Sequence, residues 1–140
     1  MEINGIVGHM VRRLYQQSSR IFSTRALEAG FDLTSVQFAA MGAIRANPGI
    51  GQAGVATAIA YDRTTIGGVI DRLEKKGFVK RSVAQQDKRA RELFLTPEGE
   101  QVFTTLRPVV QGLQSEILQH LEEDEKATFL KLLQKAVNDE

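Results

Sequence analysis

The spacing of apolar residues changes from helical to strand-like at one place along this chain, and that change limits the fold most. Apolar residues recur at three- and four-residue steps over residues 6–28, in shorter stretches up to residue 76, and again after residue 96. Residues 78–83 and 91–95 instead form two short runs joined by a polar turn, which is typical of a β-hairpin. We expect a mainly α protein with one small hairpin, and 140 residues fit one domain with helical extensions.

Capping and turn residues divide the helical stretches. Thr34 is a good N-cap, and Gly30 and Gly77 are good C-terminal stops. Thr96 followed by Pro97 predicts the start of the helix after the hairpin. One predicted helix lies between Thr34 and Pro48, and the others cover residues 6–28, 52–59, 63–76, 97–121 and 124–137. Asp62 is the predicted N-cap of the helix at 63–76, and Pro108 predicts a distortion within the helix at 97–121.

The charge of the chain is concentrated in its middle. The net charge is +1, but residues 61–91 carry nine basic and four acidic side chains, a local charge of +5. Residues 92–140 carry four basic and ten acidic side chains. Such a division predicts that the middle faces a polyanion, and ordinary surface charge is the alternative.

The residue inventory excludes several classes of function. There is no cysteine, which excludes disulfides, a thiol nucleophile, a cysteine redox sensor and a cysteine-ligated zinc site. Two histidines stand in no nucleophile motif, and no phosphate-binding loop is present. We therefore expect no enzyme, no metal and no cofactor. Without a signal peptide or an apolar run near 18 residues, we also expect a cytoplasmic protein that does not enter the membrane.

Two short helices followed by a basic hairpin form a winged helix-turn-helix, in which the second helix reads the major groove of DNA. The residues of this helix predicted to meet DNA are Arg63, Thr64, Thr65, Gly68 and Arg72. Two adjacent glycines at 67 and 68 cost about 1 kcal/mol each in a helix. They predict the close approach of a nucleic-acid backbone, with packing against the third helix as the alternative.

The hairpin supplies a second set of candidate DNA contacts. Its tip and the residue just beyond carry Gln86, Asp87, Lys88, Arg89 and Arg91. Arginines on such a wing can reach phosphates or the minor groove, and Asp87 is suited to hold Arg89 by a charge-assisted hydrogen bond. A solvated edge hairpin is the alternative, since lysines commonly protect strand edges.

An ordered series of motifs resembles the MarR family of bacterial regulators over residues 32–100. The series includes Tyr61-Asp62-Arg63-Thr64-Thr65, Asp87-Lys88-Arg89 and Leu95-Thr96-Pro97-Glu98-Gly99. The resemblance implies a winged lobe at 32–96 and a dimerisation region formed by 1–31 together with 97–140. It further implies a homodimeric repressor that binds an inverted-repeat operator and is released by a small ligand. By the same match, Gln52 lies near a helix start that can meet a phosphate.

The terminal helices support the dimer independently. The apolar stripes at positions 7, 10, 11 and 14 and at 102, 106, 109, 113 and 117 exceed what one small lobe can cover. An intramolecular helical pair is the alternative.

The sequence says less about the ligand than about DNA binding or the dimer. Four polar residues of the first helix could bind a carboxylate or phenolate: His9, Arg12, Arg13 and Gln16. The sequence of residues 60–68 resembles that of family members associated with aromatic compounds. This resemblance implies that the ligand is an aromatic acid or its coenzyme A thioester. A solvated polar stripe is the alternative, and the alternative function is a winged-helix protein-interaction module without a ligand. The sequence does not identify the operator or the regulated genes, and it does not distinguish a repressor from an activator.

Overall fold

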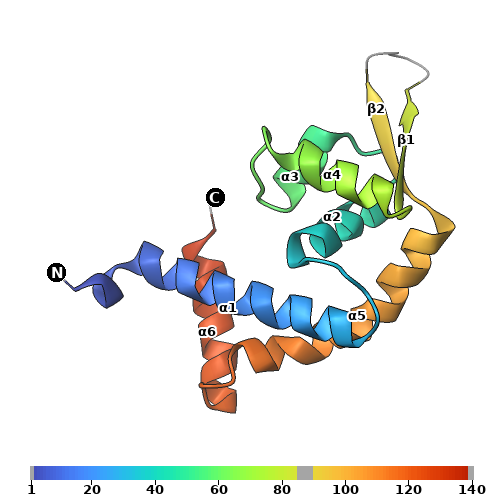
Figure 1. Ribbon diagram of the computed structural model, residues 1–140. Coiled ribbons are helices and arrows are strands. Elements are labelled where there is room, and N and C mark those ends of the chain that lie inside the picture. The colour runs from blue at the N-terminus through green and yellow to red at the C-terminus, as the bar shows by residue number, and fades with distance from the viewer. Residues whose placement is uncertain (1, 85–89, 139–140) are drawn as a thin grey trace.

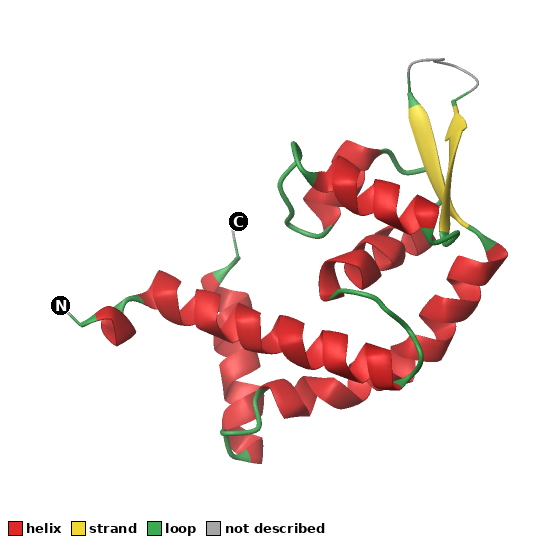
Figure 2. Ribbon diagram, in the orientation of Figure 1, coloured by secondary structure: helices red, strands yellow, loops and turns green. Residues whose placement is uncertain are grey.

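The computed structural model describes residues 2–84 and 90–138. Its elements are a short 3-10 helix Ile3–Gly5, α1 Val7–Glu28, α2 Ser35–Ala46, α3 Gln52–Ala58, α4 Ile66–Lys75, β1 Val79–Val83, β2 Arg91–Leu95, α5 Pro97–Ile117 and α6 Glu123–Ala136. In Figure 1, α2, α3, α4 and the hairpin gather into one lobe, while α1, α5 and α6 form the other part. Figure 2 shows that helix dominates, so the predicted fold class is confirmed.

The core of the lobe is formed where α2, α4 and β2 meet. Met41 and Ile44 of α2, Ile70 and Leu73 of α4, and Leu93 of β2 are almost completely shielded from solvent. The predicted apolar stripe of α4 is buried at every position, as its helical spacing requires. Strands β1 and β2 pair antiparallel, with Val79 opposite Leu95 and Val83 opposite Arg91. This core fixes the orientation of α4 relative to the hairpin.

The predicted stop and start signals act as expected. Thr34 accepts a hydrogen bond from the Gln37 amide at 3.1 Å, and the Gln37 side chain accepts one from the Thr34 amide at 3.1 Å, forming a capping box. Gly30 and Gly77 have φ angles of +97° and +82°, which side chains rarely adopt. Thr96 caps α5 by accepting from the Gly99 amide at 3.0 Å.

The C-terminal helices differ from the expectation in one respect. The helix predicted to reach Leu121 ends at Ile117. Residues 118–121 form a tight turn, with the Leu121 amide bonded to the Leu118 carbonyl at 2.9 Å. The Glu122 amide then donates to the Glu125 carboxylate at 2.8 Å, and this capping box starts α6. Pro108 lies inside α5, which is visibly bent in Figure 1.

A charged fork joins the first and fifth helices, α1 and α5. Arg25 donates from Nε and Nη2 to the two carboxylate oxygens of Glu116 at 2.8 and 2.6 Å. These hydrogen bonds hold the pKa of Glu116 below its ordinary value and raise the pKa of Arg25. The Gln17 side chain adds a hydrogen bond to the Ile117 carbonyl at 2.8 Å. The two helices are therefore joined by polar contacts as well as by packing.

The apolar stripe predicted on α5 is covered by the chain itself. Val102, Leu106 and Leu113 are buried in the core and Val109 and Ile117 are half-buried against it, which agrees with the intramolecular alternative for this stripe. In contrast, Val7 and Val11 of α1 are 79% and 52% exposed. Helix α6 has no buried residue. Most of the exposed large apolar side chains thus lie at the start of α1 and on α6.

The described residues also bear on membranes and metals. Within residues 2–84 and 90–138, no helix is both long and apolar enough to cross a membrane. The same residues contain no group of three histidine or acidic side chains placed to hold a metal ion.

Candidate nucleic-acid interface

Arg63, Thr64 and Thr65 lie in a turn before α4, and the prediction that they form its first turn is wrong. The N-cap of α4 is Thr65 rather than Asp62. The Asp62 carboxylate accepts from the Thr64 hydroxyl at 2.6 Å and from the Thr64 amide at 3.4 Å. These hydrogen bonds fold residues 62–65 into a separate turn. The turn is joined to the start of α4 by a hydrogen bond from the Ile66 amide to the Asp62 carbonyl at 3.1 Å.

This turn leaves one free cation at its surface. Hydrogen bonds from Thr64 and Thr65 hold the pKa of Asp62 below its ordinary value, so the carboxylate is charged at neutral pH. Because both hydroxyls donate to Asp62, their lone pairs remain available to accept from a ligand. Arg63 is exposed and forms no ion pair with any described residue.

The two adjacent glycines of α4 are not required by packing within the chain. A Cβ atom on Gly68 would meet only the Arg72 Nη1 atom at 3.7 Å, and one on Gly67 would meet the Gln52 Nε2 atom at 3.5 Å. Both distances are ordinary contacts. The neighbour of Gly67 agrees with the packing alternative, while Gly68 is exposed and has only the Arg72 guanidinium near it. Gly68 is thus the position on α4 where an outside backbone can come closest.

Replacing Gly68 with alanine is expected to stabilise the protein and weaken DNA binding at the same time. Alanine raises the free energy of unfolding by about 1 kcal/mol because it favours the helix. The added methyl group would keep the DNA backbone from its closest approach. Urea unfolding and DNA-binding titrations measure the two effects. Gly112→Ala in α5, where nothing lies within 4 Å, is the matched control and should change stability alone. Unchanged DNA affinity for Gly68→Ala contradicts the expectation.

The hairpin adds a further basic residue near the start of α3, where a Cβ atom on Gly51 would lie 3.8 Å from the Arg91 carbonyl oxygen. Arg91 is the first residue of β2 and is exposed. Gln86, Asp87, Lys88 and Arg89 lie outside the described residues, so their predicted roles remain predictions. β1 begins at Val79, one residue later than expected.

Gln52, the first residue of α3, is linked to the hairpin by a residue that sequence reasoning missed. Arg81 of β1 donates from Nη2 to the Gln52 Oε1 atom at 2.7 Å. The signal was present in the sequence, because Arg81 lies two positions after Val79 and therefore shares the inward face of the strand. A cation at an inward position needs partners, and only the fold shows which ones.

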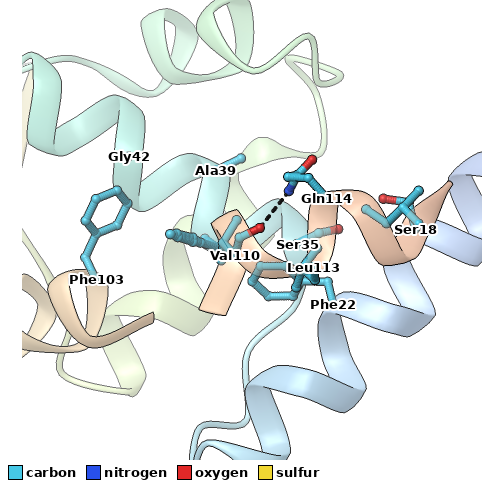
Figure 3. Close-up of a pocket in the computed structure, with 11 residues that line it drawn as sticks. Ser18, Phe22, Ser35, Ala39, Gly42, Phe103, Val110, Leu113 and Gln114 are labelled. Atoms are coloured by element: carbon cyan, nitrogen blue, oxygen red, sulfur yellow. Dashed lines mark hydrogen bonds between the residues drawn. The ribbon is translucent and has the colours of Figure 1, made fainter. Parts of the chain in front are cut away.

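A mainly apolar cavity of about 330 Å³ lies between α1, α2 and α5. Figure 3 shows its lining, with Phe22 and Phe103 among the labelled residues and the Gln114 side chain hydrogen bonded to the Val110 carbonyl. The ring centroids of Phe38 and Phe103 are 4.6 Å apart, and those of Phe22 and Phe38 are 5.6 Å apart. This cavity offers aromatic faces to a ligand, and no residue of its lining is charged.

A second, more polar cavity of about 390 Å³ lies between α1, the start of α2 and α4. Its lining includes Tyr15 and Ser19 from α1, Tyr61 from the turn before α4, and Arg72 from α4. The Ser19 hydroxyl is buried and has no partner among the described residues. Arg72 forms no ion pair within the same part of the chain. One guanidinium and several hydroxyl-bearing side chains therefore line one space.

The four predicted ligand-binding residues of α1 lie elsewhere on the single chain. Arg12, Arg13 and Gln16 are exposed, and His9 is half-buried. None of the four lines either cavity. Arg13 donates from Nη1 to Asn4 at 3.5 Å. Their role in ligand binding remains a prediction.

Comparisons with known proteins agree with this geometry. The MarR family model matches residues 33–90. Transcriptional regulator HosA of Escherichia coli O127:H6 is 33% identical over 93% of each chain. The transcriptional repressor NicR of Pseudomonas putida is 30% identical over 94% of this chain and 82% of its own.

A solved structure extends the match to the whole chain. The structure of Bordetella bronchiseptica BpsR, which addresses regulation of its DNA binding by 6-hydroxynicotinic acid, superimposes with a TM-score of 0.85 at 27% identity. The match covers 100% of this chain and 99% of BpsR. Sequence and structure together show that the chain belongs to the MarR family of DNA-binding transcriptional regulators, which are not enzymes.

Proposed function

We propose that this protein is a homodimeric repressor that binds an inverted-repeat operator and is released by a small aromatic acid. The observation that carries the proposal is that Arg63 and Arg72, before and on α4, form no ion pair with any described residue, and that Arg72 also lines the polar cavity. One basic side chain is thus available to both DNA and a ligand.

The DNA-binding face consists of α4, the turn before it, the start of α3 and the hairpin. We assign base or phosphate contacts to Gln52, Arg63, Thr64, Thr65, Gly68, Arg72 and Arg91, and wing contacts to Gln86, Asp87, Lys88 and Arg89. The described members of this set are exposed or half-buried. The charge of +5 over residues 61–91 supports the same face.

The uncovered apolar surface supports the dimer. We propose that residues 1–31 and 97–140 form the dimerisation region and that residues 32–96 form the DNA-binding lobe. Val7, Met10 and Val11 on α1 and Leu130 and Leu132 on α6 are all more than 40% exposed. Apolar patches of this kind on a soluble protein mark interaction sites. A two-fold dimer would present two copies of α4 to two half-sites about 10 bp apart.

The polar cavity supports an acidic aromatic ligand. BpsR, a structural relative, is regulated by 6-hydroxynicotinic acid. Such a molecule carries one carboxylate and one hydroxyl on a ring. The Arg72 guanidinium can pair with the carboxylate, while the Ser19, Tyr15 and Tyr61 hydroxyls can meet the ring substituent. His9, Arg12, Arg13 and Gln16 would reach a ligand only from a surface that the single chain does not enclose.

Because Arg72 could contact either DNA or the ligand, binding of the ligand could release the protein from DNA. A carboxylate paired with Arg72 removes one DNA contact and ties α4 toward α1. A tenfold release requires about 1.4 kcal/mol of coupling, and DNA must weaken ligand binding by the same factor.

The test measures binding of the purified protein to its own upstream DNA, with and without 6-hydroxynicotinic acid. Wild-type protein should bind this DNA and lose affinity when the acid is added. Arg63→Ala should lower operator affinity by about 1–3 kcal/mol. Arg72→Gln should bind DNA less tightly and lose most of the response to the acid. Arg20→Gln, which removes an exposed arginine of α1 outside both cavities, is the matched control.

The results distinguish a ligand-responsive DNA-binding repressor from a winged-helix protein-interaction module. Specific DNA binding that no aromatic acid changes would reject the ligand and leave DNA binding intact. Absence of any preference for the upstream DNA would instead favour the protein-interaction module.

A further inference from the structure

Arg81 of β1 connects three elements of the lobe through one side chain. Its Nη2 atom lies 2.7 Å from the Gln52 Oε1 atom of α3 and 2.7 Å from the Asp71 carboxylate of α4. Its Nη1 atom lies 3.4 Å from the carboxylate of Glu74, also on α4. The Arg81 side chain is 24% exposed. The hairpin, α3 and α4 are thus held together at a half-buried point.

The chemistry of this contact fixes how Gln52 is oriented. A guanidinium has only donors, so the Gln52 side chain must turn its oxygen toward Arg81. Its NH₂ group then faces away from Arg81, and its Nε2 atom lies 3.5 Å from where a Cβ atom on Gly67 would be. Gln52 therefore presents a donor beside α4, at the start of α3, where DNA phosphates and base edges accept hydrogen bonds.

Stability alone is a poor explanation for the arrangement. The Arg81 Nε atom is buried and has no hydrogen-bond acceptor among the described residues. A buried donor left unpaired costs free energy, and half-buried ion pairs add little stability. Departures of this kind are expected at functional positions.

We propose that Arg81 is a positioning residue for DNA recognition, which aims the Gln52 amide at DNA without contacting DNA itself. Two carboxylates already neutralise its charge, so Arg81 has little left to offer a phosphate. The proposal rests on the part of the proposed function in which Gln52 contacts DNA.

The test is a double-mutant cycle on operator affinity, measured over a range of salt concentrations. Arg81→Met should lower operator affinity about tenfold and leave the salt dependence unchanged, because no phosphate contact is lost. In the Gln52→Ala background, Arg81→Met should cause no further loss. Arg81→Lys should behave like Arg81→Met, because an ammonium group lacks the planar fork. Arg45→Met, which removes an arginine paired with Glu100 and outside the proposed DNA-binding face, is the control and should leave operator affinity unchanged.

Three results would overturn the proposal. A salt slope reduced by about one unit in Arg81→Met would show a direct phosphate contact. Additive losses from Arg81→Met and Gln52→Ala would show that Arg81 does not act through Gln52. If Gln52→Ala alone leaves affinity unchanged while Arg63→Ala lowers it, DNA binding stands and the Arg81 proposal fails. Should Arg81→Met not fold, Arg81→Lys carries the same cycle.

Discussion

Replacing Val11 with aspartate is expected to convert the proposed dimer into monomers and to abolish tight operator binding. Val11 is 52% exposed in the single chain and lies beside Val7 and Met10, which are also exposed. Covering it with a second chain would bury the new carboxylate, and two-fold symmetry places two such charges in one interface. We expect the dimer dissociation constant to rise at least about a hundredfold, since burying an unpaired charge costs several kcal/mol. Sedimentation velocity at micromolar concentration measures this change.

A control outside the proposed dimerisation region makes this experiment specific. Val83 of β1 is 49% exposed, and its replacement by aspartate should leave the assembly unchanged. Leu113 is unsuitable for the purpose, because it is 4% exposed and a charge there would damage the core of the chain itself. A Val11→Asp protein that stays dimeric would show that the start of α1 is not in the interface.

Replacing Gly99 with alanine is expected to cause the largest loss of stability of any single methyl group added to this chain. A Cβ atom at Gly99 would lie 2.1 Å from the Phe78 carbonyl oxygen and 2.9 Å from the Phe78 carbonyl carbon. The Phe78 oxygen cannot move away freely, because it accepts from the Thr96 amide at 3.0 Å. We expect a loss of about 3 kcal/mol or more in the free energy of unfolding.

Urea unfolding followed by circular dichroism measures this loss. Gly112→Ala, in the same helix but with open space around it, should be neutral or stabilising. If the free energy of unfolding of Gly99→Ala lies within about 1 kcal/mol of the wild-type value, the contact between Phe78 and α5 is looser than the structure shows.

Local signals in the sequence were sufficient for most element boundaries. Thr34, Gly30 and Gly77 could be recognised because a cap or a left-handed residue acts on its immediate neighbours. The start of α4 was predicted three residues too early, because Asp62 is as good a partner for its own turn as for a helix. Propensity alone does not distinguish these two uses of an aspartate.

Contacts between distant residues account for what the sequence did not reveal. The hydrogen bond between Arg81 and Gln52 joins residues 29 positions apart. No residue near Arg81 in the sequence indicates that Gln52 is its partner. The α5 stripe left two interpretations open for the same reason, since the spacing shows that a face is buried but not what buries it. The polar cavity likewise gathers residues from α1, α2 and α4.

The position of the two tyrosines has an optical consequence. The chain contains two tyrosines and no tryptophan, and both Tyr15 and Tyr61 line the polar cavity. Tyrosine emission from the unlabelled protein therefore originates at this cavity, with one tyrosine on α1 and the other just before the turn that leads into α4. A bound ligand that absorbs at the wavelength of tyrosine emission, or any change in the distance between α1 and the lobe, would alter that emission. The native protein thus contains its own spectroscopic probe, placed where the two parts of the fold meet.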